Sequence, residues 1–187
     1  KQVQSQLRDA ARSGSTWSSS FQSRVWHWAE GEDRRPSRPE NWHELAEDQE
    51  LTFHLEATAS VTIENPLGDI KVRGTQSETS TVKIHKAVWQ PFKESLEEFA
   101  KQIEISTHAT DTRLDIKVTC PDHFYEGLVD IEIEIPETAI LRASTQYGEI
   151  GIEALSGRAE AVTTTGELKV KSLAGDFRGE TVSGEIH

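Results

Sequence analysis

Apolar and polar residues alternate through most of the chain after residue 50, and an alternation with a period of two predicts β-strands. The clearest strand is Leu128–Ile135, where every second residue is Val or Ile, the residues between them are acidic, and Pro136 follows. Turn signals such as Gly74 separate shorter segments of the same kind. These segments are Leu51–Leu55, Val61–Ile63, Ile70–Val72, Val82–Ile84, Gln102–Ser106 and Arg113–Thr119.

One predicted helix interrupts the strands. Over residues 92–103 the apolar residues recur at spacings of three and four, which is the pattern of an amphipathic helix, and Pro91 precedes them. The apolar residues are Phe92, Leu96, Phe99 and Ile103. The sequence therefore predicts an all-β fold with one inserted helix.

The first 49 residues differ in composition from the rest. Residues 1–30 are rich in Ser, Gln and Arg, and their aromatic residues form a candidate interaction surface, namely Trp17, Phe21, Trp26 and Trp28. Three interpretations stay open for them: a cap on the β-domain, a contact between subunits, or stacking on sugar rings. Residues 31–50 have the composition of a linker, with a helical turn predicted at Trp42–Asp48. We expect an arm and linker over residues 1–49 and a β-domain over residues 50–187.

The C-terminal third is built on an 18-residue repeat. Gly-acid-apolar units begin at Gly148, Gly166 and Gly184, and a threonine lies three positions before each glycine. Further columns with this spacing are Ile152 and Val170, Leu155 and Leu173, and Gly157 and Gly175. Such columns are typical of a chain that coils and stacks each turn on the previous one. An earlier copy begins at Gly68, and its distance from Gly148 is not a multiple of the period, so we expect the segments between them to interrupt the register.

Charged residues one period apart test the predicted stacking. Three pairs bring opposite charges together, and each such cross-strand pair stabilises a sheet by about 0.2–1 kcal/mol. The pairs are Arg158 with Asp176, Glu160 with Arg178, and Glu153 with Lys171. One column, Glu149, Glu167 and Glu185, brings like charges together instead. It is either a solvated face or a weak site for calcium or another cation, because such cations prefer carboxylate oxygens.

The bulk composition narrows the class of function. The chain has 32 acidic and 20 basic residues and a net charge of −12, so neither nucleic acid nor an anionic membrane surface is an expected partner. No stretch is apolar enough to predict a membrane span. The chain starts at Lys1 and has no Met, which suggests a mature or trimmed chain. It stops at His187 inside a repeat, so we expect either a truncation or an open last coil.

Sequence motifs for catalysis or metal binding are missing. The chain has no nucleotide-binding glycine loop, nucleophile elbow, HExxH or CxxC, and its seven histidines are scattered. The one cysteine, Cys120, is expected to be half-buried at a strand end. Glu132 and Glu134 are candidates for the carboxylate pair of a carbohydrate-active enzyme, but both lie on the predicted outward face of a strand. We therefore expect no catalytic residues, no cofactor and no metal site other than the weak cation column.

Three features follow one another along the chain: VTIENPLGDIKVRG at residues 61–74, IEIEIP at residues 131–136, and the three Gly-acid-apolar units. In this order they resemble the putative-adhesin, domain-of-unknown-function family of bacterial envelope proteins. The resemblance covers roughly residues 50–187. It implies a right-handed β-solenoid-like stack of short strands, a location in the envelope, the periplasm or outside the cell, and no established catalytic residues.

These observations predict a non-catalytic binding or scaffolding module whose partner is a protein, either an envelope protein or a second copy. The first alternative is a subunit that assembles itself into an oligomer or filament, with the N-terminal arm adding a strand to a neighbour. The second alternative is a carbohydrate-active enzyme.

Overall fold

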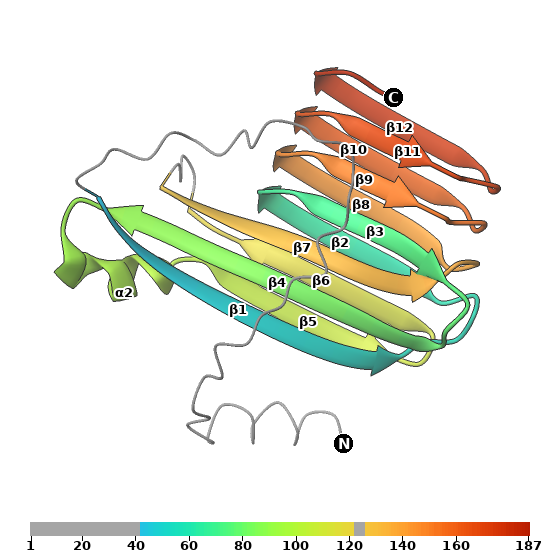
Figure 1. Ribbon diagram of the computed structural model, residues 1–187, viewed down its shortest axis with the longest axis horizontal. Coiled ribbons are helices and arrows are strands. Elements are labelled where there is room, and N and C mark those ends of the chain that lie inside the picture. Colours follow the sequence, from blue (N-terminus) through green and yellow to red (C-terminus); the bar gives the residue numbers. More distant parts are fainter. Residues whose placement is uncertain (1–41, 122–125) are drawn as a thin grey trace. The chain divides into compact units, whose positions relative to one another are not determined.

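The computed structural model describes residues 42–121 and 126–187, which form two six-stranded β-sheets and one short helical segment (Figure 1). Sheet A has the order β1-β4-β7-β3-β9-β11, and sheet B has the order β12-β10-β8-β2-β6-β5. The all-β prediction is confirmed. The strands are β1 (His43–His54), β2 (Ser60–Leu67), β3 (Ile70–Thr75), β4 (Thr79–Gln90), β5 (Glu104–Thr110), β6 (Arg113–Thr119), β7 (Gly127–Pro136), β8 (Ile140–Tyr147), β9 (Ile150–Glu153), β10 (Ala159–Thr165), β11 (Leu168–Lys171) and β12 (Phe177–Ser183).

From β8 onward the chain alternates between the two sheets. Strands β8, β10 and β12 lie side by side in sheet B, and β9 and β11 lie side by side in sheet A, in each case parallel. Residues one period apart are direct partners: Thr163 pairs with both Thr145 and Thr181, and Leu168 pairs with Ile150. The 18-residue period of the sequence therefore equals the separation in sequence between residues that pair on neighbouring strands. The handedness of the coil stays a prediction.

The earlier copy of the unit, which begins at Gly68, pairs with this stack at a sequence separation that is not a multiple of the period, as the sequence predicts. Strands β2 and β3 pair with β8 and β9 at an offset that is not a multiple of the period, for example Ile70 with Ile150. The chain between the two copies supplies β4 and β7 to sheet A and β5 and β6 to sheet B. These strands, some of them antiparallel, extend both sheets beyond the coiled part.

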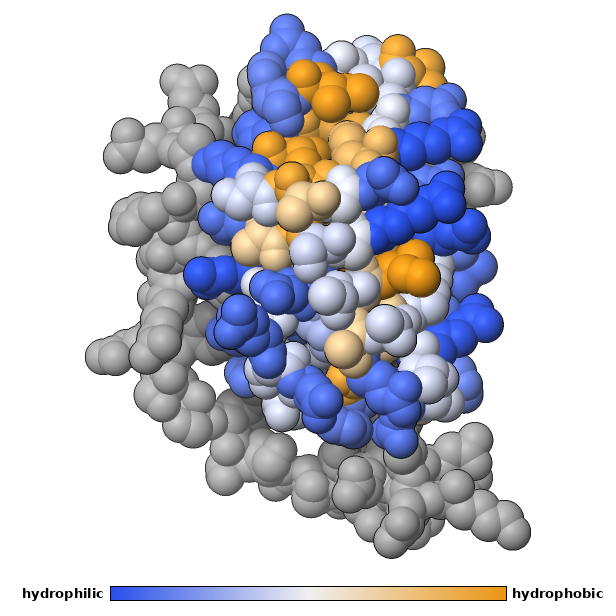
Figure 2. All heavy atoms as spheres, turned by 90° about the vertical axis from the view of Figure 1, so that its right-hand side faces the viewer, coloured by the Kyte–Doolittle hydropathy of each residue, from blue (hydrophilic) through white to orange (hydrophobic). Residues whose placement is uncertain are grey.

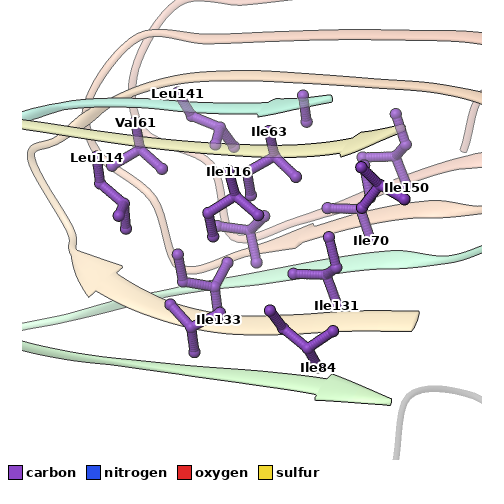
Figure 3. Packing of buried hydrophobic residues seen from close by; sticks show 14 of the residues in the cluster. Val61, Ile63, Ile70, Ile84, Leu114, Ile116, Ile131, Ile133, Leu141 and Ile150 are labelled. Carbon is purple, nitrogen blue, oxygen red and sulfur yellow. The ribbon is translucent and has the colours of Figure 1, made fainter. Parts of the chain in front are cut away.

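Aliphatic side chains from the two sheets fill the space between them. In Figure 3, Ile131 and Ile133 of sheet A point toward Ile116 and Val61 of sheet B, and all four are at most 3% exposed. Because side chains alternate along a strand, every second residue of each central strand enters this interior. Fully burying one such side chain contributes about 1.5–3 kcal/mol. The interior is thus a mainly apolar layer with a few buried polar side chains, and the charged side chains lie on the outer faces.

The inserted helix is shorter than the sequence predicts. A 3₁₀ turn, η1 (Lys93–Ser95), leads into α2 (Leu96–Ala100), and Leu96 and Ala100 are buried. Phe92 was predicted on the apolar face of this helix, but its side chain is 70% exposed. Its backbone is extended, with φ −114° and ψ 120°, so it precedes the helix and cannot share the helical face.

The helical turn predicted at Trp42–Asp48 is wrong, because His43–His54 forms strand β1. This strand pairs with β4 along its whole length, and twelve residues of ladder outweigh a weak local helical pattern. The boundary expected at residue 50 falls inside β1. The candidate interaction residues Trp17, Phe21, Trp26 and Trp28 lie outside the described residues, and the role of the arm stays a prediction.

Two smaller expectations concern Cys120 and membrane spans. Cys120 follows β6 and is half-buried against the core, as the sequence predicts. Among the residues that the structure describes, no helix has the length and apolarity needed to cross a bilayer.

Candidate functional site

A row of mostly acidic residues crosses the whole of sheet A. Four apolar residues are partners in register on neighbouring strands: Ile131, Ile70, Ile150 and Leu168. The residue that precedes each of them therefore lies next to its counterpart on the neighbouring strand. A bridge between Leu168 and Ile186 extends the row by one residue, and the partners of β7 in β4 and β1 extend it on the other side. We call this set the acidic row: Asp48, His85, Asp130, Asp69, Glu149, Glu167 and Glu185.

Two aspartates of the acidic row bind the backbone of the neighbouring strand. Asp69 donates its backbone N–H to Asp130 Oδ1 at 3.0 Å, and Glu149 donates its backbone N–H to Asp69 Oδ1 at 2.8 Å. Each bond joins adjacent strands at the corner that follows a glycine, where the chain enters sheet A. A hydrogen bond to an ionised carboxylate contributes about 1.5–3 kcal/mol. Asp130 and Asp69 are therefore held in place by the backbone.

Asp130 is the carboxyl group whose titration the fold changes most clearly. Burial raises the pKa of Asp130 above its ordinary value of 3.8, and the nearby Asp69 carboxylate adds to this increase. The hydrogen bond from the backbone of Asp69 lowers the pKa of Asp130, and the charges of His85 and Lys71 lower it further, but burial outweighs them. His85 is in register with Asp130, and its Nδ1 lies 2.7 Å from Asp48 Oδ1 on the outermost strand of the sheet.

Lys169 lies between two carboxylates of the column predicted as a weak cation site. Its Nζ is 2.6 Å from Glu149 Oε2 and 3.3 Å from Glu167 Oε2, and the hydrogen bond to Glu149 is the main cause of its raised pKa. Its partner in β9 is Gly151, which has no side chain, so the ammonium group has room to lean over that strand. The repulsion expected within this column is therefore offset by Lys169.

The third member of the column, Glu185, is exposed, with its Oε2 3.1 Å from His187 Nε2. Among the described residues, no group of three or more His, Cys, Asp or Glu side chains is arranged to hold a metal ion. The ammonium group of Lys169 takes the place that a bound cation would have between Glu149 and Glu167. A cation role for the column stays a prediction.

Glu132 and Glu134, considered from the sequence as a catalytic pair, form a ladder of opposite charges. Both are half-buried on the outer face of β7, each opposite a basic residue of β3. Glu132 Oε1 lies 3.8 Å from Lys71 Nζ, and Glu134 is in register with Arg73. This arrangement supports a structural role on the sheet surface.

The outer face of sheet B carries the cross-coil charges predicted from the repeat. Glu160 is in register with Arg142 on one side and Arg178 on the other, and its Oε2 lies 3.6 Å from Arg142 Nε. Val162 and Val182 are exposed on the same strands. In sheet A, Glu153 pairs in register with Lys171 as predicted.

The apolar interior is less well covered toward β11 and β12. Figure 2 views the molecule from the side where β3 and β7 end, and hydrophilic residues there flank a band of apolar residues, most of them in its upper half. Leu155 is 1% exposed, whereas Leu173, one period later, is only half-buried. The column of these two leucines is therefore fully buried at Leu155 and only partly buried at Leu173.

Sequence reasoning found three members of the acidic row and missed four. It recognised Glu149, Glu167 and Glu185 because they recur with the period of the repeat. The motif at Gly68 was a signal for Asp69, but its irregular distance from the later units concealed its position in the column. Asp130, His85 and Asp48 belong to strands outside the repeat, and only the pairing of β7, β4 and β1 reveals them.

The fold and this surface define an all-β module whose ionisable side chains lie on sheet faces around an apolar interior. No protein-family model and no curated protein matches the chain. Among solved structures, a putative cell adhesion protein from Clostridium sporogenes is similar, with 10% identity, a TM-score of 0.47, and coverage of 76% of this chain and 98% of that one.

Two structures from Parabacteroides distasonis are also similar to this chain. One is a putative adhesin with 13% identity, a TM-score of 0.33, and coverage of 76% of this chain and 69% of that one. The other is a putative lipid binding protein with 10% identity, a TM-score of 0.32, and coverage of 74% and 62%. Two of these three neighbours are thus named as a cell adhesion protein or an adhesin.

Proposed function

We propose that this chain is a non-catalytic binding module of the cell envelope or the extracellular space, and that its partner is a protein surface rich in Lys and Arg. The observation that carries the proposal is the acidic row. Neighbouring strands lie about 4.8 Å apart, so the row presents carboxylates at a short, regular spacing across one sheet. A partner with several cationic groups matches such an array better than a single small ion does.

Two features favour a binding role for the row over a catalytic one. The interior between the sheets is filled by aliphatic side chains, so a ligand meets the outer faces. Asp69 and Asp130 already bind backbone N–H groups, and Glu149 binds Lys169. Charges fixed in this way steer an oppositely charged partner and set its register, which favours specificity and association rate.

The proposal keeps the right-handed β-solenoid-like body and the envelope location that the sequence resemblance implies. Parallel pairing of residues one period apart supports a coil, and an experimental structure would test its hand. Fractionation of the source cells tests the location, because recovery of the protein in the cytosolic fraction alone would contradict it. Self-assembly through residues 1–30 is tested by deleting them, since an unchanged assembly state would remove that alternative.

Two variants with the same change in net charge test the role of the acidic row. The first variant removes three of the six carboxylates of the row with Glu→Gln changes at Glu149, Glu167 and Glu185. The control variant makes three Glu→Gln changes on sheet B, at Glu64, Glu160 and Glu180. Calorimetry with a lysine-rich peptide, at low and at physiological salt, measures binding to the native chain and to both variants.

The first variant is expected to lose about 1–2 kcal/mol of binding free energy, or roughly five- to thirtyfold in affinity, because exposed ion pairs contribute a few tenths of a kcal/mol to about 1 kcal/mol each. The control variant is expected to lose much less. Equal losses would show that net charge alone attracts the peptide, and the acidic row would then have no special role.

A further inference from the structure

Strand β5 (Glu104–Thr110) is an edge strand that lacks the usual protection against pairing. In the part of the chain that the structure describes, β6 is its one neighbour in sheet B. The strand is seven residues long and contains no Lys, Arg or Pro, the residues that commonly block an exposed edge. Its one acidic residue is Glu104. Three of its residues are Ile or Thr, which suit an extended conformation.

The hairpin that joins β5 to β6 shows which backbone groups of β5 face outward. Thr110 and Arg113 are partners across a two-residue turn, so they form a hydrogen-bonded pair, and such pairs recur at every second residue. The residues between them therefore point their N–H and C=O groups away from β6. These residues are Ile105, Thr107 and Ala109.

The same three residues also face the interior, and they are incompletely covered there. Their partners in β6, Leu114, Ile116 and Val118, are at most 3% exposed, whereas the residues of β5 are only half-buried. A further strand beside β5 would pair the outward backbone groups and cover this apolar surface together.

The neighbouring edge of sheet A, strand β1, is protected against such pairing by its charge. Strand β1 carries four acidic residues, so two β1 strands would repel each other: Glu44, Glu47, Asp48 and Glu50. In a chain of net charge −12, two copies can approach most easily where the surface has few acids. Of the two neighbouring edges, β5 is the one that meets this condition.

We propose that two copies of this chain associate through β5, edge to edge and antiparallel, about a two-fold axis. A two-fold contact places residue i of one copy opposite residue j of the other, and j opposite i. Centred on Thr107, the pairing sets Ile105 opposite Ala109 of the second copy and Ser106 opposite His108. Glu104 then lies opposite Thr110, so no two acids meet. Sheet B continues through the axis as one sheet.

This interface is formed by the edge of sheet B, whereas the acidic row lies on sheet A, and it does not depend on the function proposed for that row. Each dimer would present two acidic rows, so a partner with two basic sites would bind with higher apparent affinity than to one copy.

Light scattering of the full chain over a range of concentrations tests the proposal. The native chain is expected to show twice the monomer mass of 20.9 kDa. Thr107→Lys places a charge at the centre of the interface and is expected to return the mass to that of the monomer, because an inward charge on an edge strand blocks pairing. Gln49→Lys makes the same change of charge at the β1 edge and is expected to leave the dimer intact.

A native chain that stays monomeric at every concentration would overturn the proposal, and so would a dimer that survives Thr107→Lys. If Thr107→Lys does not fold, hydrogen exchange of the native chain decides the matter. The amides of Ile105, Thr107 and Ala109 are then expected to exchange more slowly as the concentration rises. Exchange at these amides that is independent of concentration would contradict pairing through β5.

Discussion

Gly166 is the position where one added methyl group tests how closely the coils stack. Its φ is 155°, in a region that residues with a Cβ rarely adopt. A Cβ at Gly166 would lie 1.9 Å from the carbonyl oxygen of Gly148 and 2.7 Å from its carbonyl carbon. Both atoms are backbone of the preceding coil, so neither can rotate away. Gly166→Ala must therefore distort the corner or push two coils apart.

The expected loss of stability follows from these two effects. Holding a residue with a Cβ in this region of φ and ψ costs about 1–3 kcal/mol, and forcing extra volume into a close-packed contact costs about 1–3 kcal/mol more. Gly166→Ala should therefore lower the free energy of unfolding by about 2–6 kcal/mol. That is a large share of the roughly 5–15 kcal/mol by which a typical domain is stable.

Gly179→Ala is the matched control, because it adds the same methyl group at a position of β12 in register with Ala161 of β10. The atoms nearest to its Cβ would belong to side chains, the ring of Phe177 at 2.8 Å and Leu168 Cδ1 at 3.1 Å, and the half-buried ring would have to shift. We expect a change within about 1 kcal/mol. Urea titrations followed by circular dichroism measure both variants. Equal, small losses in the two variants would refute the stacking argument.

Three further substitutions probe single interactions. Asp130→Asn keeps an oxygen for the Asp69 N–H and removes the buried charge, so it should stabilise the protein at pH 7. Because the pKa of Asp130 is raised in the folded protein, this gain in stability should shrink as the pH falls through that pKa and vanish below 3.8. Urea titrations at several pH values measure this dependence. Ser80→Ala removes a fully buried hydroxyl that finds no hydrogen-bond partner among the described residues, so thermal melts should show unchanged or higher stability. Thr163→Val removes the bond from a buried hydroxyl to the Gly148 carbonyl oxygen and should cost about 0.5–1.5 kcal/mol in urea titrations, whereas no loss would exclude that bond as a contributor.

The repeat was predictable because its constraints recur along the chain. Thr145, Thr163 and Thr181 each donate a hydroxyl hydrogen bond to a corner glycine of the coil before, so the same chemistry is required once in every repeat. The alternation of Leu128–Ile135 was equally informative, since a strand with a buried face must place its apolar residues at every second position. The spacing of residues along the chain is sufficient to predict a structure when the same physical requirement recurs in every repeat or at every second residue.

Features that depend on distant pairing could not be predicted in this way. Asp69 meets Asp130 because β3 pairs with β7, and the long segment between them contains no repeat that would fix the register. The helical turn expected at Trp42–Asp48 was a local pattern that the long β1–β4 ladder overrode. The acidic row therefore depends on the pairing of distant strands, and only its three periodic members, Glu149, Glu167 and Glu185, could be recognised in the sequence.

The geometry that stacks the coils also builds the acidic row. In each unit a glycine at the corner permits close approach, and the residue after it is the first to enter sheet A and is acidic at Asp69, Glu149 and Glu167. Every added coil thus contributes one more carboxylate at strand spacing. The repulsion that accumulates along such a row has to be offset from within the sheet, as Lys169 does for two of its members. A longer stack of such units would present a longer charged surface, so the number of coils would set how many cationic groups of a partner can be bound at once.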